Sequence, residues 1–443
     1  MHKPATKGET YLEVIIAMGI FIVLSQAIIV LANTGYELIG FTRARNVART
    51  LALTKMEYAR NLPYNSVGTV GGIPSGTIPQ NEAVAINGQE YKVNTTVVYV
   101  DDKFDGVSPT DTVPNDYKRV RVEVTWTGLG PTGTKSVLIS DIAPKGIESV
   151  SGGGTLSLLV FDSTGKPVPN ASISIVSSGI TPAVNLNVTS NDNGRIVLPE
   201  ATACVKCYRV TVTKSGMSTD RTYGTSEVAN PSKANLTVTT GNLTEMSFTI
   251  DTTANLTLHT ANSRALSFSA LSSQSLIVKG SKVIGTDTLD NPVYKYNSVV
   301  TTDASGNLAL NNMEWDTYSI STATASAYTF GGTNPLNPIQ LAPSANQSFT
   351  ASMPTKTTHS LWAAFTDAAR NPIASVTATL KDGGVAIATA SAGLNTDPDF
   401  GQVFFDSLAN KTYTLDASVS GYQQSTTTIP VNGNTYSEII LNP

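Results

Sequence analysis

Residues 7–13 read Lys-Gly-Glu-Thr-Tyr-Leu-Glu and residues 14–32 read VIIAMGIFIVLSQAIIVLA, and this stretch is the most informative part of the 443-residue chain. About twenty consecutive apolar residues suffice for a helix that spans the hydrocarbon core of a bilayer. No other stretch of the sequence is comparably apolar, so we predict one membrane segment at 14–32. No proline occurs between Lys7 and Pro63, which predicts a single long helix over residues 9–62.

The residues just before the apolar run form a specific pattern. An ionised carboxylate inside a membrane costs about 2.5–3.5 kcal/mol, so Glu13 indicates a partner for its charge. A basic residue, Lys7, then Gly8, then Glu13 ahead of an apolar helix resembles the processing site of type IV prepilins and pseudopilins. The resemblance implies that residues 1–8 are a leader, that a prepilin peptidase cuts after Gly8, and that Glu9 becomes the new N-terminus. Glu9 departs from the Phe or Met that is usual in the family at this position.

The same resemblance implies how the chain is assembled. Glu13 would pair with the α-ammonium group of a neighbouring pilin subunit and set the register of the helices in a filament. We therefore expect the protein in the bacterial inner (cytoplasmic) membrane before assembly, and in an extracellular filament or at the cell surface afterwards. Two alternatives stay open. One is a single-pass anchor whose Glu13 reaches the membrane interface, and the other is a secretory signal peptide, although no small-residue cleavage site follows the run.

Strand signals follow the helix. Ala83–Ile86 and Glu90–Val100, joined by Asn87-Gly88, predict a hairpin with a two-residue turn. The stretch Val120–Trp126 alternates strictly, which places its valines and its tryptophan on one face of a strand. A long helix laid on a small antiparallel sheet is the pilin fold, so we predict an α+β pilin-like domain whose sheet occupies residues 63–148.

An acidic loop interrupts this predicted sheet. Asp101, Asp102 and Asp105 lie in it beside Gly106. Clustered carboxylates next to a glycine turn can coordinate Ca²⁺, but Thr112 stands where an EF-hand loop carries its closing Glu. A solvated turn that uses Asp side chains for local hydrogen bonds is the alternative. Calcium therefore stays a candidate ligand, and we predict no required cofactor.

The rest of the chain repeats loosely three times. After a Gly-rich linker at 149–154, we predict β-sandwiches at 155–250, 251–354 and 355–443. Each repeat carries a proline-containing turn, at 164–168, 289–293 and 369–373. Each also carries a second tight turn, at 191–194, 302–306 and 396–401. A tyrosine then opens a later strand of each repeat: Tyr208, Tyr318 and Tyr413. These markers resemble the carboxypeptidase-regulatory-like and Cna-B-like families of prealbumin-type sandwiches. The resemblance implies tandem all-β, Ig-like domains after the pilin-like domain.

Few residues are available for catalysis or metal binding. Cys204 and Cys207 form one Cys-x-x-Cys and lack the second pair that a zinc ribbon needs. We expect a local disulfide between them, with two free thiols as the alternative. Only His259 and His359 lie outside the predicted leader, and no nucleophile–base–orienter set can be assembled from them. We predict that the protein is not an enzyme.

Aromatic residues of the second and third repeats are candidates for ligand contact. Trp315, Trp362, Tyr294 and Tyr296 could line a glycan- or peptide-binding face, and the alternative is that they belong to the sandwich cores. The sequence alone leaves both roles open and names no extracellular ligand.

Composition narrows the function further. Charged residues make up 14% of the chain and the net charge is −4, which excludes a polycationic nucleic-acid binder and a charge-driven disordered chain.

We predict a minor or tip pilin-like subunit of a type IV filament that displays its sandwiches for adhesion or as spacers. Its partners would be the prepilin peptidase, other pilin subunits, the membrane and an unknown extracellular ligand, with no nucleic acid. A pseudopilin of a secretion or DNA-uptake machine, or a simple surface anchor, is the alternative.

Overall fold

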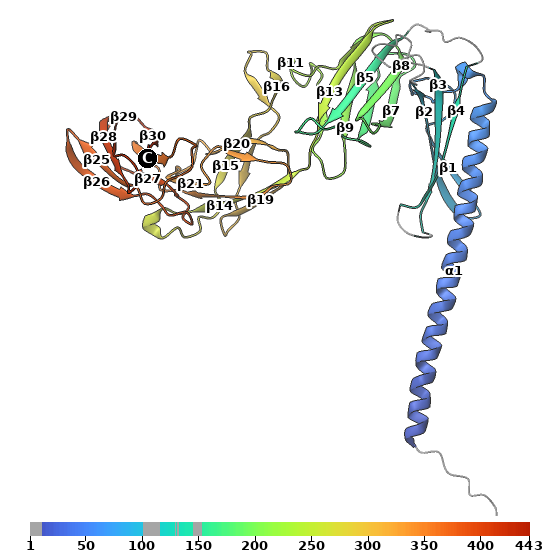
Figure 1. Ribbon diagram of the computed structural model, residues 1–443, viewed down its shortest axis with the longest axis horizontal. Helices are drawn as coiled ribbons and strands as arrows, with labels where there is room; N and C mark the ends of the chain where they lie inside the picture. The colour runs from blue at the N-terminus through green and yellow to red at the C-terminus, as the bar shows by residue number, and fades with distance from the viewer. Residues whose placement is uncertain (1–10, 101–115, 129, 131–132, 145–152) are drawn as a thin grey trace, which may run out of the picture.

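The computed structural model describes residues 11–100, 116–128, 130, 133–144 and 153–443, with side chains from Val14 onward. It contains one long helix, a four-stranded sheet packed on that helix, and three β-sandwiches in tandem (Figure 1). This architecture confirms the predicted fold class, an α+β helix-on-sheet domain followed by all-β sandwiches.

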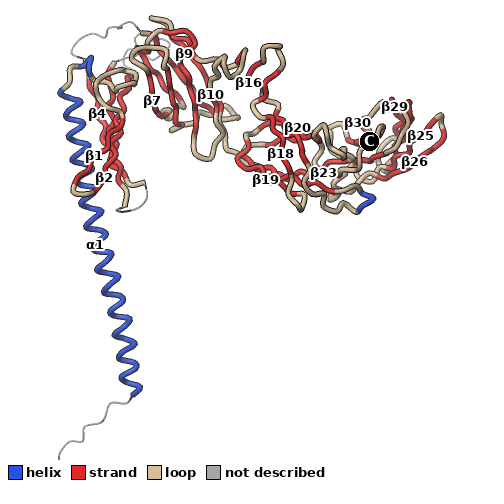
Figure 2. The backbone as a smooth tube through the Cα atoms, turned by 180° about the vertical axis from the view of Figure 1, so that it is seen from behind, coloured by secondary structure: helices blue, strands red, loops and turns tan. Residues whose placement is uncertain are grey.

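Helix α1 runs from Tyr11 to Asn61 without a break. At about 1.5 Å per residue, a helix of 51 residues is about 75 Å long. It is long and apolar enough from Val14 onward to cross a membrane. The helix ends just before Pro63, because the residue that precedes a proline disfavours the helical conformation. Its C-terminal half lies along the sheet, and its N-terminal half projects away from the rest of the chain (Figure 2).

The sheet on this helix is antiparallel throughout, with strand order β1-β2-β3-β4. After a 3₁₀ turn, η1 (Tyr64–Ser66), its strands are β1 (Asn81–Ile86), β2 (Gln89–Val100), β3 (Tyr117–Trp126) and β4 (Lys135–Ile142). The expected turn at Asn87-Gly88 joins β1 to β2, and both of its residues have positive φ, 52° and 78°. The alternating valines of β3 and Trp126 are buried, as predicted. Against them lie Ala44, Ala48 and Ala52, one helical turn apart, whose small side chains let α1 approach the sheet closely.

The first sandwich combines a sheet of order β10-β9-β6-β7, to which β12 adds on β9, with a sheet of order β13-β5-β8. Its strands are β5 (Gly154–Phe161), β6 (Ser172–Ser177), β7 (Val184–Thr189), β8 (Arg195–Ala201), β9 (Cys204–Thr213), β10 (Asp220–Arg221), β11 (Asn230–Pro231), β12 (Leu236–Val238) and β13 (Leu243–Thr249). The first and last strands, β5 and β13, run parallel, so both ends of the domain lie in one sheet.

The second and third sandwiches repeat this plan, each with a parallel pair of first and last strands. The second combines β19-β14-β23-β21 with β18-β15-β20-β22, and the third combines β27-β24-β30 with β26-β25-β28-β29. The elements of the second are β14 (Ala254–Ala261), η2 (Arg264–Leu266), β15 (Ser275–Gly280), β16 (Val283–Thr286), β17 (Pro292–Tyr294), β18 (Asn297–Thr301), β19 (Asn307–Met313), β20 (Asp316–Thr322), β21 (Gly332–Asn334), β22 (Ile339–Leu341) and β23 (Asn346–Ser352). Those of the third are β24 (Ser360–Thr366), β25 (Thr377–Asp382), β26 (Val385–Ser391), β27 (Gln402–Phe405), β28 (Lys411–Ser418), β29 (Ser425–Val431) and β30 (Asn434–Ile440).

The three marker tyrosines occupy equivalent strands. Tyr208 in β9, Tyr318 in β20 and Tyr413 in β28 are all buried. Each hydroxyl donates a hydrogen bond to a backbone carbonyl a few residues upstream: Thr202 at 2.8 Å, Glu314 at 2.8 Å and Ala409 at 3.4 Å. A buried tyrosine that returns its hydroxyl to the preceding loop fixes the corner at which a strand enters the sheet.

The structure contradicts one of the predicted repeat markers. The turn at 289–293, predicted as the counterpart of 164–168 and 369–373, joins β16 to β17 and does not follow the first strand of its sandwich. The local chemistry of the three turns is the same, because Asp162, Asp287 and Asp367 each accept hydrogen bonds from backbone N–H groups two and four residues ahead. The conformation of such a turn depends on its own residues and does not indicate which strands of the domain it connects.

The predicted Gly-rich linker is shorter than 149–154. Gly154 is the first residue of β5, opposite Ala201 of β8. A Cβ atom on Gly154 would lie 2.4 Å from the carbonyl oxygen of Thr239, and one on Gly153 would lie 2.5 Å from the carbonyl carbon of Glu200. These two glycines are therefore required for close packing inside the first sandwich.

Candidate functional site

The first candidate site is the N-terminal half of α1. Its large apolar side chains are exposed on every side, for example Phe21 at 71% and Leu31 at 74%. A water-soluble domain rarely leaves such a continuous apolar surface uncovered. This half of the helix is thus suited to a lipid bilayer or to packing against other apolar helices.

The residues expected to govern processing lie at the edge of this helix. Lys7, Gly8 and Glu9 lie outside the described residues. Glu13 is in the first turn of α1 as the backbone describes it, and its side chain is outside the description. The structure therefore places Glu13 on the helix and leaves its predicted partner untested.

The calcium candidates Asp101, Asp102 and Asp105 also lie outside the described residues. Within the described part of the chain, no group of three or more His, Cys, Asp or Glu residues is arranged to hold a metal ion. Cys204 and Cys207 are joined by a disulfide at the start of β9, with Cα atoms 6.0 Å apart.

The helix-on-sheet domain is docked on the first sandwich. Ile73, from the loop after α1, is 2% exposed and belongs to the hydrophobic core of that sandwich. The side chain of Gln80 donates to the carbonyl of Asn185 at 2.7 Å, and the Asn185 N–H donates to the carbonyl of Gly71 at 2.7 Å. The hydroxyl of Tyr99 donates to the carboxylate of Glu200. Apolar and polar contacts together hold the two domains in one orientation.

A buried lysine lies beneath this contact. Lys118 in β3 is 2% exposed, and its ammonium group donates to the carbonyls of Tyr64 at 2.9 Å and Val67 at 2.8 Å. The rings of Tyr64 and Tyr99 lie 4.6 and 5.2 Å from the same nitrogen, within the range of a cation–π interaction. Burial lowers the pKa of Lys118 to about 8, although the carboxylate of Glu200 acts in the opposite direction.

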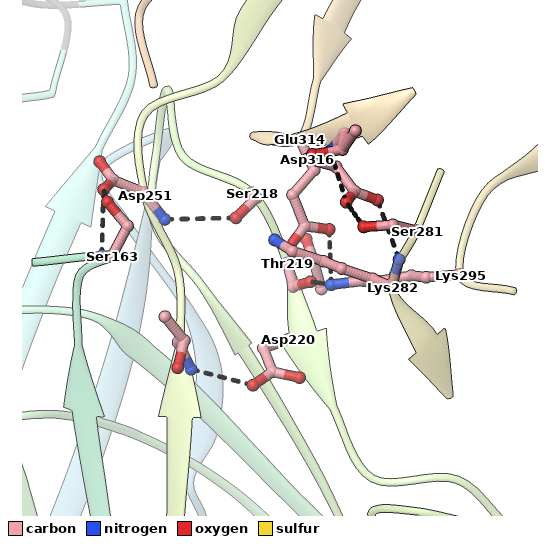
Figure 3. Close-up of polar contacts among 12 residues, drawn as sticks. Ser163, Ser218, Thr219, Asp220, Asp251, Ser281, Lys282, Lys295, Glu314 and Asp316 are labelled. Atoms are coloured by element: carbon pink, nitrogen blue, oxygen red, sulfur yellow. Dashed lines mark hydrogen bonds and ion pairs between the residues drawn. The ribbon is translucent and has the colours of Figure 1, made fainter. Parts of the chain in front are cut away.

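The first and second sandwiches share a small sheet. The β16–β17 hairpin extends from the second sandwich, and β16 pairs with β11 of the first. Beside it, Lys295 donates to the carbonyl of Thr219 across the junction at 2.7 Å and forms an ion pair with Glu314 at 2.6 Å. Lys282 approaches the other oxygen of Glu314 at 2.8 Å (Figure 3). Backbone pairing and a bridging lysine thus fix this junction.

The second and third sandwiches are joined by an arginine. Arg264 in η2 donates from Nε to Asp399 at 3.0 Å and from Nη2 to Asp397 at 2.9 Å, both in the loop before β27. The side chain of Asp399 is only 9% exposed; burial raises its pKa and the Arg264 guanidinium counters that rise. Nearby, fully buried Gln402 of β27 bonds to the backbone of Thr333 in the second sandwich, at 3.0 and 2.6 Å.

The four aromatic residues that were candidates for ligand contact have different surroundings. The ring of Trp362 packs against the core of the second sandwich, and its Nε1 donates to Gln402 at 3.0 Å, so it belongs to the junction. Trp315 lies under the Lys282 ammonium at 3.2 Å and Tyr294 near that of Lys279 at 4.7 Å. Tyr296 borders a cavity at the junction of the first two sandwiches.

None of the three junctions was predicted from the sequence. The contacts join residues far apart in the chain, and each uses an ordinary side chain with no motif around it. Arg264 and Asp399, for example, are 135 positions apart. The three domain contacts nevertheless set the arrangement of the sandwiches, because they join each module to the next.

No family model matches the chain, and no curated protein matches it. Among solved structures, it is similar to the Bacillus anthracis TIE protein at 11% identity, over 82% of this chain and 73% of that one, with a TM-score of 0.19. It is similar to a streptococcal ancillary pilin at 11% identity, over 66% and 98% of the chains, with a TM-score of 0.18. The shaft pilin SpaA of Lactobacillus rhamnosus GG follows at 14% identity, over 46% and 98%, with a TM-score of 0.19.

Proposed function

We propose that the protein is a minor or tip subunit of a type IV pilus-like filament, anchored and assembled through α1. In this proposal a prepilin peptidase removes residues 1–8, and the apolar half of α1 passes from the cytoplasmic membrane into a bundle of helices from other pilin subunits. The sandwiches are displayed on the filament for adhesion or as spacers. The role is structural, and we expect no catalytic activity.

The observation that carries the proposal is the contrast between the two halves of α1. One face of the C-terminal half is packed on a sheet, whereas the large apolar side chains between residues 14 and 39 are exposed in the isolated chain. Burying one large apolar side chain gains about 1.5–3 kcal/mol, so a run of them favours either lipid or neighbouring helices strongly. In the bundle, the charge of Glu13 at the start of this run would pair with the α-ammonium group of a neighbouring subunit.

The docked junctions support the display role. Each sandwich is fixed to its neighbour by bonds that cross the junction, so the three modules act as a stiff arm that projects from the helix-on-sheet domain (Figure 1). Three added domains would also crowd a shaft in which every subunit is in contact with its neighbours. Low copy number, as in a minor or tip subunit, avoids that crowding.

Two substitutions and one matched control test the assembly step. Gly8→Val is expected to block cleavage, and Glu13→Leu to block filament incorporation without preventing membrane insertion. Glu37→Leu, at an exposed carboxylate of the same helix beyond the apolar run, is expected to do neither. Normal incorporation of Glu13→Leu would contradict the assembly role of this carboxylate.

Immunogold labelling of intact cells tests the position of the subunit. Label at filament tips is the expected result. Label along the whole shaft would contradict a minor role, and label confined to the membrane would indicate a pseudopilin or a simple anchor.

A further inference from the structure

A cavity of about 580 Å³ opens at the junction of the first two sandwiches. The loop after β9 contributes Met217 and Thr219 from the first sandwich, while Tyr296 and strand β19 contribute the opposite wall from the second. Ligand pockets in proteins usually have volumes of about 300–1,000 Å³, so the space suits a small organic molecule. Because both sandwiches line it, its shape depends on the docked junction.

The fixed charges around the cavity neutralise one another. Glu314 is held between Lys282 at 2.8 Å and Lys295 at 2.6 Å. Asp316 accepts hydrogen bonds from the Ser281 hydroxyl at 2.6 Å and from the Lys282 N–H at 3.2 Å (Figure 3). A charged ligand would have to break these short contacts and leave a partly buried charge unpaired, which is costly. The wall therefore favours a neutral ligand.

Among the uncharged polar side chains of the lining, Ser218 and Thr253 are already hydrogen-bonded within the protein, and two others are not. The side-chain amide of Asn311 and the hydroxyl of Tyr296 have no hydrogen-bond partner among the residues that the structure describes. The Tyr296 ring is held edge-on against Tyr318, with ring centroids 5.7 Å apart, so it is a fixed aromatic surface. An amide that can donate and accept, beside a rigid aromatic ring, matches a molecule with hydroxyl groups on its rim and C–H groups on its face.

We propose that this cavity binds a neutral saccharide of about two sugar rings. The hydroxyls would bond to the Asn311 amide and the Tyr296 hydroxyl, and a sugar ring would lie on the Tyr296 side chain. The proposal does not depend on filament assembly, since a single chain contains the complete cavity. It assigns the junction two roles, holding the arm stiff and recognising a glycan.

The test uses the full chain in an amine-oxide detergent, because glycoside detergents would compete for the cavity. Fluorescently labelled protein is screened on an array of neutral di- and trisaccharides of glucose, galactose, mannose and N-acetylglucosamine. Positive sugars are then titrated by isothermal calorimetry. We expect saturable binding of at least one of them with a stoichiometry of one per chain.

Three substitutions at exposed positions locate the binding. Ala309→Trp places a large ring in the cavity mouth and is expected to abolish binding, while Asn311→Ala is expected to weaken it about tenfold. Val299→Trp introduces the same ring on β18, away from the cavity lining, and is expected to bind as the wild type does. Failure of every sugar to bind the wild type would overturn the proposal. So would binding that survives both Ala309→Trp and Asn311→Ala.

Discussion

Lys118 provides the most direct test of how the helix-on-sheet domain is packed. Its ammonium group is buried, bonds to two carbonyls, and has a pKa that burial lowers to about 8. The substitution Lys118→Met keeps an unbranched side chain of similar length and removes both the charge and the two hydrogen bonds. Comparing the two proteins across pH separates the cost of the buried charge from the gain of its hydrogen bonds.

The sign of the effect follows from proton binding. Between about pH 8 and 10.5, the ordinary pKa of a lysine, the unfolded lysine still holds a proton that the folded one has released. Stability therefore rises with pH in this window. A pKa lowered from 10.5 to about 8 corresponds to about 2–3 kcal/mol of added stability between pH 7 and pH 10. Measurements stop at pH 10, because burial also raises the pKa of Tyr99, which reverses the trend above that pH.

Lys118→Met should lack this gain. The carbonyl of Val67 loses its bond to Lys118, whereas that of Tyr64 keeps the Val67 N–H as a donor at 3.1 Å. The unbonded Val67 carbonyl costs about 1–3 kcal/mol at every pH, so it shifts the whole curve and does not change its slope. The exposed Lys92 of the neighbouring strand offers the matched control Lys92→Met, which should retain the wild-type slope.

The assay is urea unfolding of the full chain at pH 7 and pH 10. The chain has three tryptophans, and Trp126 lies in the same strand as Lys118, so its fluorescence reports this domain once Trp315 and Trp362 are replaced by Phe. If wild type and Lys118→Met gain the same stability between the two pH values, the buried charge does not have the role argued for it.

Two further predictions concern the junctions. Arg264→Ala removes the bonds to Asp397 and Asp399 and should give a broader distribution of shapes by small-angle scattering. Arg370→Ala breaks an ion pair inside the third sandwich and should leave the distribution unchanged. Equal scattering profiles of the two variants would contradict the role of Arg264 in joining the second and third sandwiches. Gly285→Ala would place a Cβ atom 2.3 Å from the carbonyl oxygen of Asn230 and should lower stability by about 1–3 kcal/mol in thermal unfolding, while Gly433→Ala, with open space around it, should have little effect.

Local sequence patterns predicted the elements of the fold well. The apolar run at 14–32, the absence of proline up to Pro63 and the alternation of Val120–Trp126 each describe interactions within one element. The period of a helix or strand is written directly in the order of the residues. The marker tyrosines belong to the same class, since each bonds to a carbonyl only four to six positions upstream.

Local patterns failed where position in the topology mattered. The turn at 289–293 has the same hydrogen bonds as its supposed counterparts and yet belongs to the hairpin that pairs with the first sandwich. Gly153 and Gly154 read as a flexible linker, but neighbouring backbone leaves no room for a side chain at either position. In both cases the deciding contact lies tens of residues away in the chain.

An apolar helix, a helix-on-sheet domain and a series of sandwiches could be predicted from the amino-acid sequence, because hydrophobicity and periodicity are properties of each segment. How the modules are joined, and the cavity between two of them, became apparent only in the folded chain. Bonds such as Gln80 to Asn185, Lys295 to Thr219 and Arg264 to Asp399 join separately folded surfaces. The residues of one surface do not indicate such a contact, because it depends on the positions of side chains on two folded domains that pack against each other.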